Sequence, residues 1–192
     1  MPDDGANGYE EHAEIFMRAR NLKIGLSVMR KWASQFGPGS ELLELGCGHG
    51  VVSQVLLEAG VKLSGVDASP TLLREFHKRF PDVEVECSTA QTSELLSRKY
   101  DGVVAWGLIF LLAEADQRWV LRRAADALRP NGRLVFTAPN EALTWTDSIT
   151  ELPSLSLGAT VYEALLRDLG LDVSSGVIDE GGNCYYEGIK PS

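Results

Sequence analysis

Apolar residues follow a helical spacing over the first part of the chain. Over residues 9–20 and again over 24–36, hydrophobic side chains recur every three or four positions, and the second segment runs into glycine and proline at 37–39. This spacing places the apolar side chains on one helix face, so it predicts two helices. Residues 1–8 are polar and rich in glycine, and we expect a loose tail there.

From residue 41 onward, short apolar runs alternate with helical patterns. The runs that predict strands are 41–45, 61–66, 83–87, 101–106, 132–138, 171–178 and 183–189. The patterns that predict helices are 50–59, 69–80, a short one at 91–98, 115–128 and 158–169. Such alternation indicates right-handed βαβ units on a parallel sheet. Only residues 179–182 separate the last two runs, which indicates an antiparallel hairpin.

Together these elements predict an α/β fold. We expect a doubly wound, seven-stranded, mostly parallel sheet with an antiparallel C-terminal hairpin, packed as an α/β/α sandwich. One domain is expected over 1–192, with a tail and N-terminal helical cap over 1–38 and the core over 40–192. Segment 140–158 fits neither period, because it is polar and interrupted by proline. Long irregular stretches in compact domains are usually functional, so we expect a lid there.

The first predicted strand ends in a glycine-rich loop, ELLELGCGHG at 41–50. In a doubly wound sheet, ligands bind beyond the carboxyl ends of the strands, where such a loop opens a helix. A dinucleotide site needs G-x-G-x-x-G, but the third glycine position counted from Gly46 is Val51. The Gly-Lys-Ser/Thr of a P-loop is absent as well. Glu44 lies beside the glycines, and a carboxylate suits a ligand that carries an ammonium and a sulfonium.

This loop resembles motif I of the class I S-adenosylmethionine-dependent methyltransferases, an acidic residue followed by x-G-x-G-x-G. Three later stretches resemble landmarks of the same family in the same order: GVDAS at 65–69, YDGVVAW at 100–106 and LRPNGRLVFTAPN at 128–140. The resemblance covers about residues 40 to 140. It implies a Rossmann-like fold, S-adenosylmethionine as the cofactor and S-adenosylhomocysteine as the product.

The resemblance also implies roles for particular residues. Glu44 is expected on the ammonium side of the cofactor, and Asp67 is expected to accept hydrogen bonds from both ribose hydroxyls. Relatives often carry Asp-Ala after the third strand, where this chain has Thr89 and Ala90. Adenine contact is therefore assigned to backbone at Ala90 and Gln91. The expected cofactor residues are Glu44, Gly46, Cys47, Gly48, Gly50, Asp67, Ala68, Ala90, Gln91 and Trp106.

The methyl acceptor is less defined by the sequence. After the fourth strand the chain reads WGLIF at 106–110, which lacks both Asn/Asp-Pro-Pro-Tyr/Phe and Pro-Cys, the signatures of enzymes that methylate nucleic acid bases. The net charge of -9 also disfavours nucleic acid. An apolar lining suits a small, partly apolar acceptor. His12, Trp145 and Asp147 are the candidates for acceptor contact or proton transfer.

We therefore expect methyl transfer to a small molecule by in-line displacement, which requires alignment more than side-chain chemistry. A base is needed only if the acceptor loses a proton. Two other functions stay open: a non-catalytic module that binds S-adenosylmethionine or S-adenosylhomocysteine, and methylation of protein or RNA with a partner. A nicotinamide dehydrogenase is disfavoured by Val51. The acceptor atom and the choice between monomer and homodimer are undetermined.

Three features predict a cytoplasmic protein without metal or membrane attachment. The cysteines Cys47, Cys87 and Cys184 are too scattered for a disulfide framework or a zinc site. The first twenty residues are acidic and lack the apolar segment of a signal peptide. The longest apolar run, 102–113, is too short to cross a bilayer.

Overall fold

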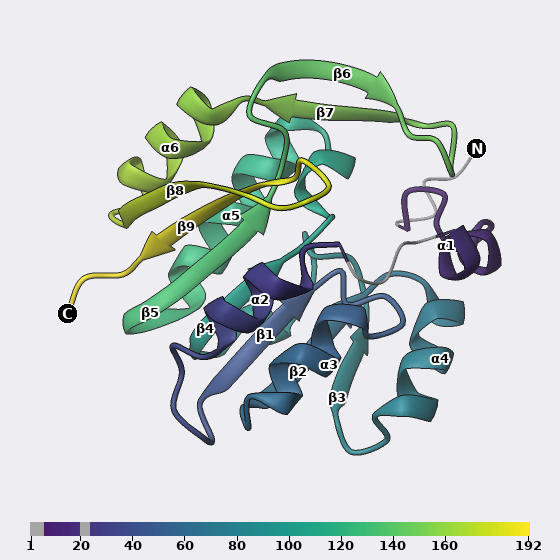
Figure 1. Ribbon diagram of the computed structural model, residues 1–192, viewed down its shortest axis with the longest axis horizontal. Helices are drawn as coiled ribbons and strands as arrows, with labels where there is room; N and C mark the ends of the chain where they lie inside the picture. The colour runs from purple at the N-terminus through teal and green to yellow at the C-terminus, as the bar shows by residue number, and fades with distance from the viewer. Residues whose placement is uncertain (1–5, 20–23) are drawn as a thin grey trace.

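A computed structural model describes residues 6–19 and 24–192 and contains a seven-stranded sheet of order β3-β2-β1-β4-β5-β9-β8 (Figure 1). Neighbouring strands from β3 to β5 pair in parallel, and β9 lies antiparallel between β5 and β8. The predicted fold class is thus confirmed. The strands are β1 (Glu41–Leu45), β2 (Lys62–Asp67), β3 (Glu84–Cys87), β4 (Tyr100–Ala105), β5 (Leu128–Thr137), β8 (Asp172–Ile178) and β9 (Cys184–Ile189).

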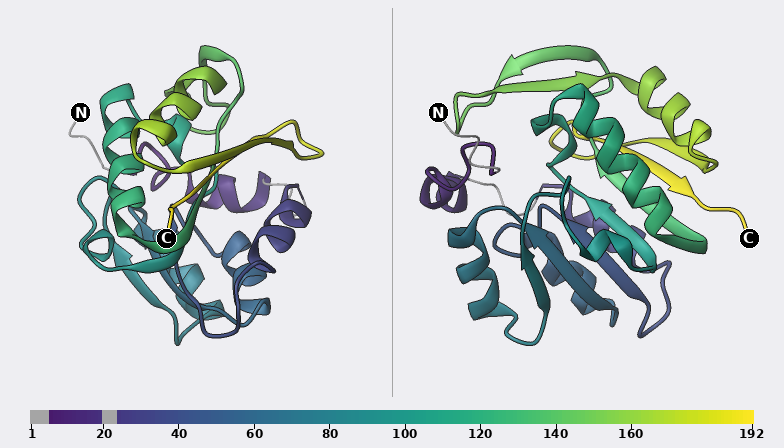
Figure 2. Two further views of the ribbon diagram at one scale, coloured as in Figure 1. Left: turned by 90° about the vertical axis from the view of Figure 1, so that its left-hand side faces the viewer. Right: turned by 180° about the vertical axis from the view of Figure 1, so that it is seen from behind.

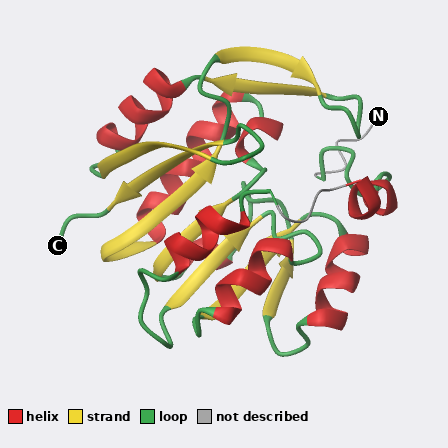
Figure 3. Cartoon of the chain, in the orientation of Figure 1, coloured by secondary structure: helices red, strands yellow, loops and turns green. Residues whose placement is uncertain are grey.

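Helices cover both faces of this sheet (Figure 3). On the face toward the viewer in Figure 1 lie α2 and α3, while α5 crosses the opposite face, which the right-hand view of Figure 2 shows from behind. The helices are α1 (Ala13–Ala19), α2 (Leu26–Ala33), α3 (Val51–Glu58), α4 (Pro70–Arg79), α5 (Glu114–Ala127) and α6 (Ala159–Asp168), with 3-10 turns η1 (Leu95–Ser97) and η2 (Ile109–Leu111).

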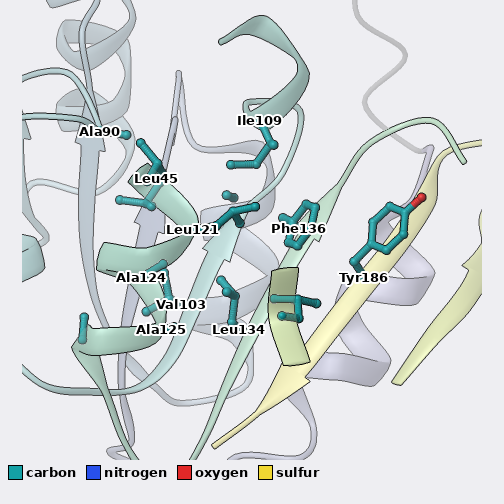
Figure 4. Packing of buried hydrophobic residues seen from close by; sticks show 14 of the residues in the cluster. Leu45, Ala90, Val103, Ile109, Leu121, Ala124, Ala125, Leu134, Phe136 and Tyr186 are labelled. Carbon is teal, nitrogen blue, oxygen red and sulfur yellow. The ribbon is translucent and has the colours of Figure 1, made fainter. Parts of the chain in front are cut away.

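Two apolar clusters hold the layers together because successive strand residues point to opposite faces. In β1, Leu42 packs with α2 and α3, whereas Leu43 packs with α5. The same division separates Tyr185 from Tyr186 in β9, and the Tyr186 ring stacks on Phe136 with centroids 5.1 Å apart (Figure 4). Because both faces are covered, the central strands read as continuous apolar runs.

The segment predicted to be irregular is instead a β-hairpin. Strands β6 (Ala142–Thr146) and β7 (Pro153–Leu157) pair antiparallel and form a separate two-stranded sheet. Serines occupy inward positions of β7: Ser154 and Ser156 are buried, and the Ser156 hydroxyl donates to the Pro139 carbonyl at 2.8 Å. Because the inward positions carry hydroxyls, apolar and polar residues do not alternate along this strand. The sequence therefore lacks the pattern that predicts a strand. The prediction that this segment is irregular was wrong.

The predicted helix at 91–98 is also wrong, since only the 3-10 turn η1 forms there. The carboxylate of Glu86, on β3, accepts hydrogen bonds from the Ser93 hydroxyl at 2.6 Å and from the Leu95 amide at 3.1 Å. These contacts satisfy donors at the start of η1 and tie the segment to the sheet edge. They oppose the pKa rise that burial alone would give Glu86, and the net pKa is lowered.

We expect Gly50→Ala to lower the free energy of unfolding by about 3 kcal/mol. Gly50 is the N-cap residue of α3 and has φ 87°, and a Cβ there would lie 2.5 Å from Cε2 of Phe80. Gly170→Ala is the matched control, because Gly170 has φ 76° and open space around it. In this control only backbone strain lowers the free energy of unfolding, by about 1 kcal/mol. Urea unfolding of both variants measures the difference, and equal losses would show that the Phe80 contact is unimportant.

Candidate cofactor site

A pocket lies beyond the carboxyl ends of β1, β2, β3 and β4, and it encloses about 840 Å³ including the space at its mouth. All of the expected cofactor residues line it except Gly50, which caps α3. The residues that line it from the sheet side are Glu44, Gly46, Cys47, Gly48, His49, Val66, Asp67, Ala68, Ser88, Thr89, Ala90, Gln91, Trp106, Gly107 and Leu108.

The loop after β1 is fixed by its own backbone amides. The amides of Gly46 and Cys47 both donate to the Val66 carbonyl of β2, at 2.8 and 3.0 Å. Gly46 and Gly48 have positive φ values of 70° and 53°, which a residue with a Cβ rarely adopts. Burial, together with the charges of Glu44 and Asp67, raises the pKa of the Cys47 thiol, so this side chain stays protonated.

Glu44 brings a buried carboxylate into the pocket. Its side chain points to the α3 face of β1, where the Ser53 hydroxyl donates to Glu44 Oε2 at 2.5 Å. The residue is only 3% exposed. Buried carboxylates are stabilised by cations or multiple hydrogen bonds. A ligand ammonium in the pocket would provide such a cation, which agrees with the role implied for Glu44.

Asp67 ends β2 and faces the same pocket. Its Oδ2 accepts a hydrogen bond from the Gly48 amide at 2.8 Å, and its Oδ1 accepts one from the Ser69 amide at 2.9 Å. Each oxygen keeps a second lone pair, so the carboxylate can also accept from two vicinal hydroxyls. Burial raises the pKa of Asp67; the two amides oppose the rise and the charge of Glu10 adds to it.

Trp106 follows β4 and is held from behind by a buried tyrosine. Its Nε1 donates to the Tyr185 hydroxyl at 2.9 Å, and that hydroxyl donates to Asp179 Oδ2 at 3.0 Å. Burial raises the pKa of Tyr185 far above its ordinary value, so the hydroxyl remains protonated. Tyr185 and Asp179 lie on β9 and in the turn before it, and the sequence pattern gave no sign of this contact with Trp106.

The N-terminal segment closes another side of the pocket. Ala6, Asn7, Tyr9 and Phe16 line it, and the Asn7 side chain donates to the Leu111 carbonyl at 2.8 Å. Glu10 binds the start of α4, where it accepts from the Ser69 hydroxyl at 2.5 Å and from the Thr71 hydroxyl at 2.6 Å. A helix N-terminus favours a carboxylate, but Glu10 precedes α4 by 60 positions, so no local sequence signal identified it.

The three candidates for acceptor contact lie outside the lining of this pocket in the described structure. Nδ1 of His12 lies 3.0 Å from the Gly8 carbonyl, and the Trp145 ring packs on Phe110 with centroids 5.4 Å apart. Asp147 orders the tip of the β6–β7 hairpin by accepting the Thr150 amide at 2.8 Å. Its other oxygen lies 3.4 Å from the hydroxyl of Tyr9. Asp147 thus adjoins the pocket through Tyr9.

The described residues form neither a cluster of metal-binding side chains nor a membrane-spanning helix. Over 6–19 and 24–192, no group of three or more histidine, cysteine, aspartate or glutamate side chains could hold a metal ion. No helix in the described part of the chain is long and apolar enough to cross a membrane.

Comparison with known proteins finds similarity to methyltransferases. Residues 42–132 match the family described as "Methyltransferase domain". The ubiquinone biosynthesis O-methyltransferase of Xanthomonas campestris pv. campestris (strain B100) is 22% identical over 160 residues, which cover 81% of this chain and 59% of that protein. The cypemycin N-terminal methyltransferase of Streptomyces sp is 35% identical over 106 residues, 53% of this chain and 43% of that protein. The chain therefore spans less than two thirds of the length of these relatives.

Solved structures share the fold. Magnesium protoporphyrin IX methyltransferase from Synechocystis PCC 6803 with bound S-adenosylmethionine superposes with a TM-score of 0.75 at 14% identity, covering 99% of this chain and 98% of that one. The glycopeptide N-methyltransferase MtfA with S-adenosylhomocysteine gives 0.69 at 20% identity, with coverages of 87% and 90%. The match over 42–132, just under half of the chain, and the shared fold agree with the resemblance to methyltransferases that the motifs indicated.

For Asp67→Asn, we expect the affinity for S-adenosylhomocysteine at neutral pH to fall about 10- to 100-fold, because hydrogen bonds to a charged acceptor are lost. The wild-type affinity should also decrease as the pH falls toward the raised pKa of Asp67. The affinity falls at lower pH because the ribose hydroxyls donate to the ionised carboxylate, so protonation of Asp67 opposes binding. Calorimetry across the acidic range measures both effects. Asp82→Asn, at an exposed carboxylate, is the control; a pH dependence that persists in Asp67→Asn would assign it to another group.

For Glu10→Ala, we expect S-adenosylhomocysteine to dissociate several-fold faster, because hydrogen bonds that hold segment 6–18 over the pocket are lost. Displacement kinetics with excess ligand measure the rate. Glu11→Ala is the matched control, since Glu11 is the exposed neighbour of Glu10. Equal rates in the two variants would show that the contact with α4 does not retain the ligand.

Proposed function

We propose that the protein transfers a methyl group from S-adenosylmethionine to a small-molecule acceptor by in-line displacement. This proposal rests mainly on one observation: Glu44, Asp67 and Trp106 line the same pocket at the carboxyl edge of the sheet. In the reaction, a lone pair of the acceptor forms the new bond to the methyl carbon. The electron pair of the broken carbon–sulfur bond returns to sulfur and leaves S-adenosylhomocysteine. The protein's task is chiefly alignment, because the donor is already activated.

Each end of the cofactor has a matching group in the pocket. Glu44 would bind the ammonium of the methionine part, and Asp67 would accept from the ribose hydroxyls. Backbone at Ala90 and Gln91 would face the adenine. Trp106 would then lie beneath the methyl group, with its indole fixed by Tyr185.

The character of the remaining wall supports a small, partly apolar acceptor. The side chains of Tyr9, Phe16, Leu108, Leu111 and Leu112 line the pocket, and such surfaces bind compact organic molecules. The names of the relatives, which refer to ubiquinone, protoporphyrin and glycopeptide, agree with this class. The net charge of -9 disfavours a nucleic acid acceptor.

The three candidate residues outside the pocket lining are given a different role. His12, Trp145 and Asp147 lie on the N-terminal segment and on the β6–β7 hairpin. Asp147 is linked to the pocket through Tyr9. We assign these three residues to contacts with parts of the acceptor that extend beyond the pocket, where Asp147 could attract a positively charged group.

The test is turnover with a panel of small phenols, amines, carboxylates and thiols. We expect the wild-type protein to release S-adenosylhomocysteine with at least one acceptor, and Asp67→Ala to lower the rate at least about tenfold through weaker cofactor binding. Mass spectrometry of the acceptor identifies the methylated atom. Tight cofactor binding without turnover on the panel would favour a non-catalytic module. Absence of any binding would refute the proposal.

A further inference from the structure

Helix α5 contacts the loop that follows β3 through two side chains that do not line the pocket. The guanidinium of Arg123 donates to the Gln91 carbonyl at 2.9 Å, to the Ala90 carbonyl at 3.3 Å and to the Ser93 carbonyl at 2.6 Å. One turn earlier on the same helix face, Trp119 Nε1 donates to the same Gln91 carbonyl at 3.2 Å. Two side chains thus donate hydrogen bonds to three carbonyls of one short loop.

Arg123 differs from the other arginines on α5. Arg118 forms an ion pair with Glu114, and Arg122 is exposed. Within the described residues, Arg123 has no carboxylate within ion-pair distance, and it is partly buried against the backbone carbonyls. A partly buried cation held only by carbonyls polarises those peptide groups.

The direction of these carbonyls decides where the neighbouring amide points. A trans peptide is planar, and its N–H points opposite to its C=O. The Ala90 carbonyl faces α5, so the amide of Gln91, which shares that peptide, faces the other way. Ala90 and Gln91 both line the pocket. In the described structure the Gln91 amide donates to no protein acceptor, which leaves it available to a ligand.

The residues of this loop that line the pocket, 88–91, offer no carboxylate for the adenine. Thr89 stands at the position where relatives often carry an aspartate, and its hydroxyl lies 2.8 Å from that of Thr92. Recognition of the base therefore depends on backbone, and the backbone conformation depends on what holds the carbonyls.

We infer that Arg123, assisted by Trp119, is a positioning residue for cofactor recognition. It holds the carbonyls of the loop against α5, so that the amide of Gln91 is turned toward a ring nitrogen of the adenine and is strengthened as a donor. Arg123 does not itself touch the ligand. The inference rests on the proposed function in one respect, namely that the pocket binds the adenosyl group.

The test compares S-adenosylhomocysteine with its 1-deaza and 3-deaza adenine analogues, in which one ring nitrogen acceptor is replaced by C–H. In the wild-type protein, one analogue should bind about 5- to 10-fold more weakly, the loss of a single hydrogen bond. In Arg123→Ala, the affinity for S-adenosylhomocysteine should fall about tenfold and the difference between the natural ligand and that analogue should disappear. Arg122→Ala, one residue away on the same helix, should behave like the wild type.

Two further variants separate positioning from a general loss of structure. Arg123→Lys keeps a cation and should restore part of the analogue discrimination, while Trp119→Phe removes a single N–H and should reduce the discrimination less than Arg123→Ala. Urea unfolding checks that each variant is folded. A uniform loss of affinity for all three ligands in Arg123→Ala, or no loss, would overturn the inference. If the wild-type protein binds none of them, the proposed function fails instead.

Discussion

Three backbone amides bind the loop after β1 to the end of β2, and the geometry of the pocket depends on them. Gly46 and Cys47 donate to the Val66 carbonyl, and Gly48 donates to the Asp67 carboxylate. The parallel register that pairs Leu45 with Val66 brings these groups together. Since Glu44 and Asp67 both lie on these two strands, one local pairing sets the separation of the two carboxylates proposed to bind the ammonium and the ribose.

Ser69 connects this pairing of β1 and β2 to the N-terminal segment. The amide of Ser69 donates to Asp67, its hydroxyl donates to Glu10, and the same hydroxyl accepts from the Leu72 amide as the cap of α4. Ser69 therefore contributes both to closure of the pocket by the N-terminal segment and to the orientation of the Asp67 carboxylate. The negative charge of Glu10 also contributes to the raised pKa of Asp67, so a ligand that donates hydrogen bonds to Asp67 relieves part of this repulsion.

The sequence predicted the elements whose signals are local. Strands buried on both faces are continuous apolar runs, and the glycine loop with Asp67 has a fixed spacing along the chain. The sheet and many of the residues that line the pocket were therefore predictable. The β6–β7 hairpin was not, because its inward positions carry Ser154 and Ser156 in place of apolar side chains. Contacts between distant segments were equally hidden: Trp106 and Tyr185 are 79 positions apart, and Arg123 lies 32 positions from Gln91.

This difference explains why the sequence defines the donor side of the pocket better than the acceptor side. The donor side is built from the ends of consecutive parallel strands, where covalent connection and sheet register leave little freedom. The proposed acceptor side is assembled from the N-terminal segment and the loop after β4, whose contact through Asn7 and Leu111 spans 104 positions. Tyr9 also meets the hairpin tip at Asp147, 138 positions away. Segments joined only by such distant contacts can change in sequence independently of the sheet. Under the proposed function, different acceptors could then be accommodated while the residues at the strand ends stay the same.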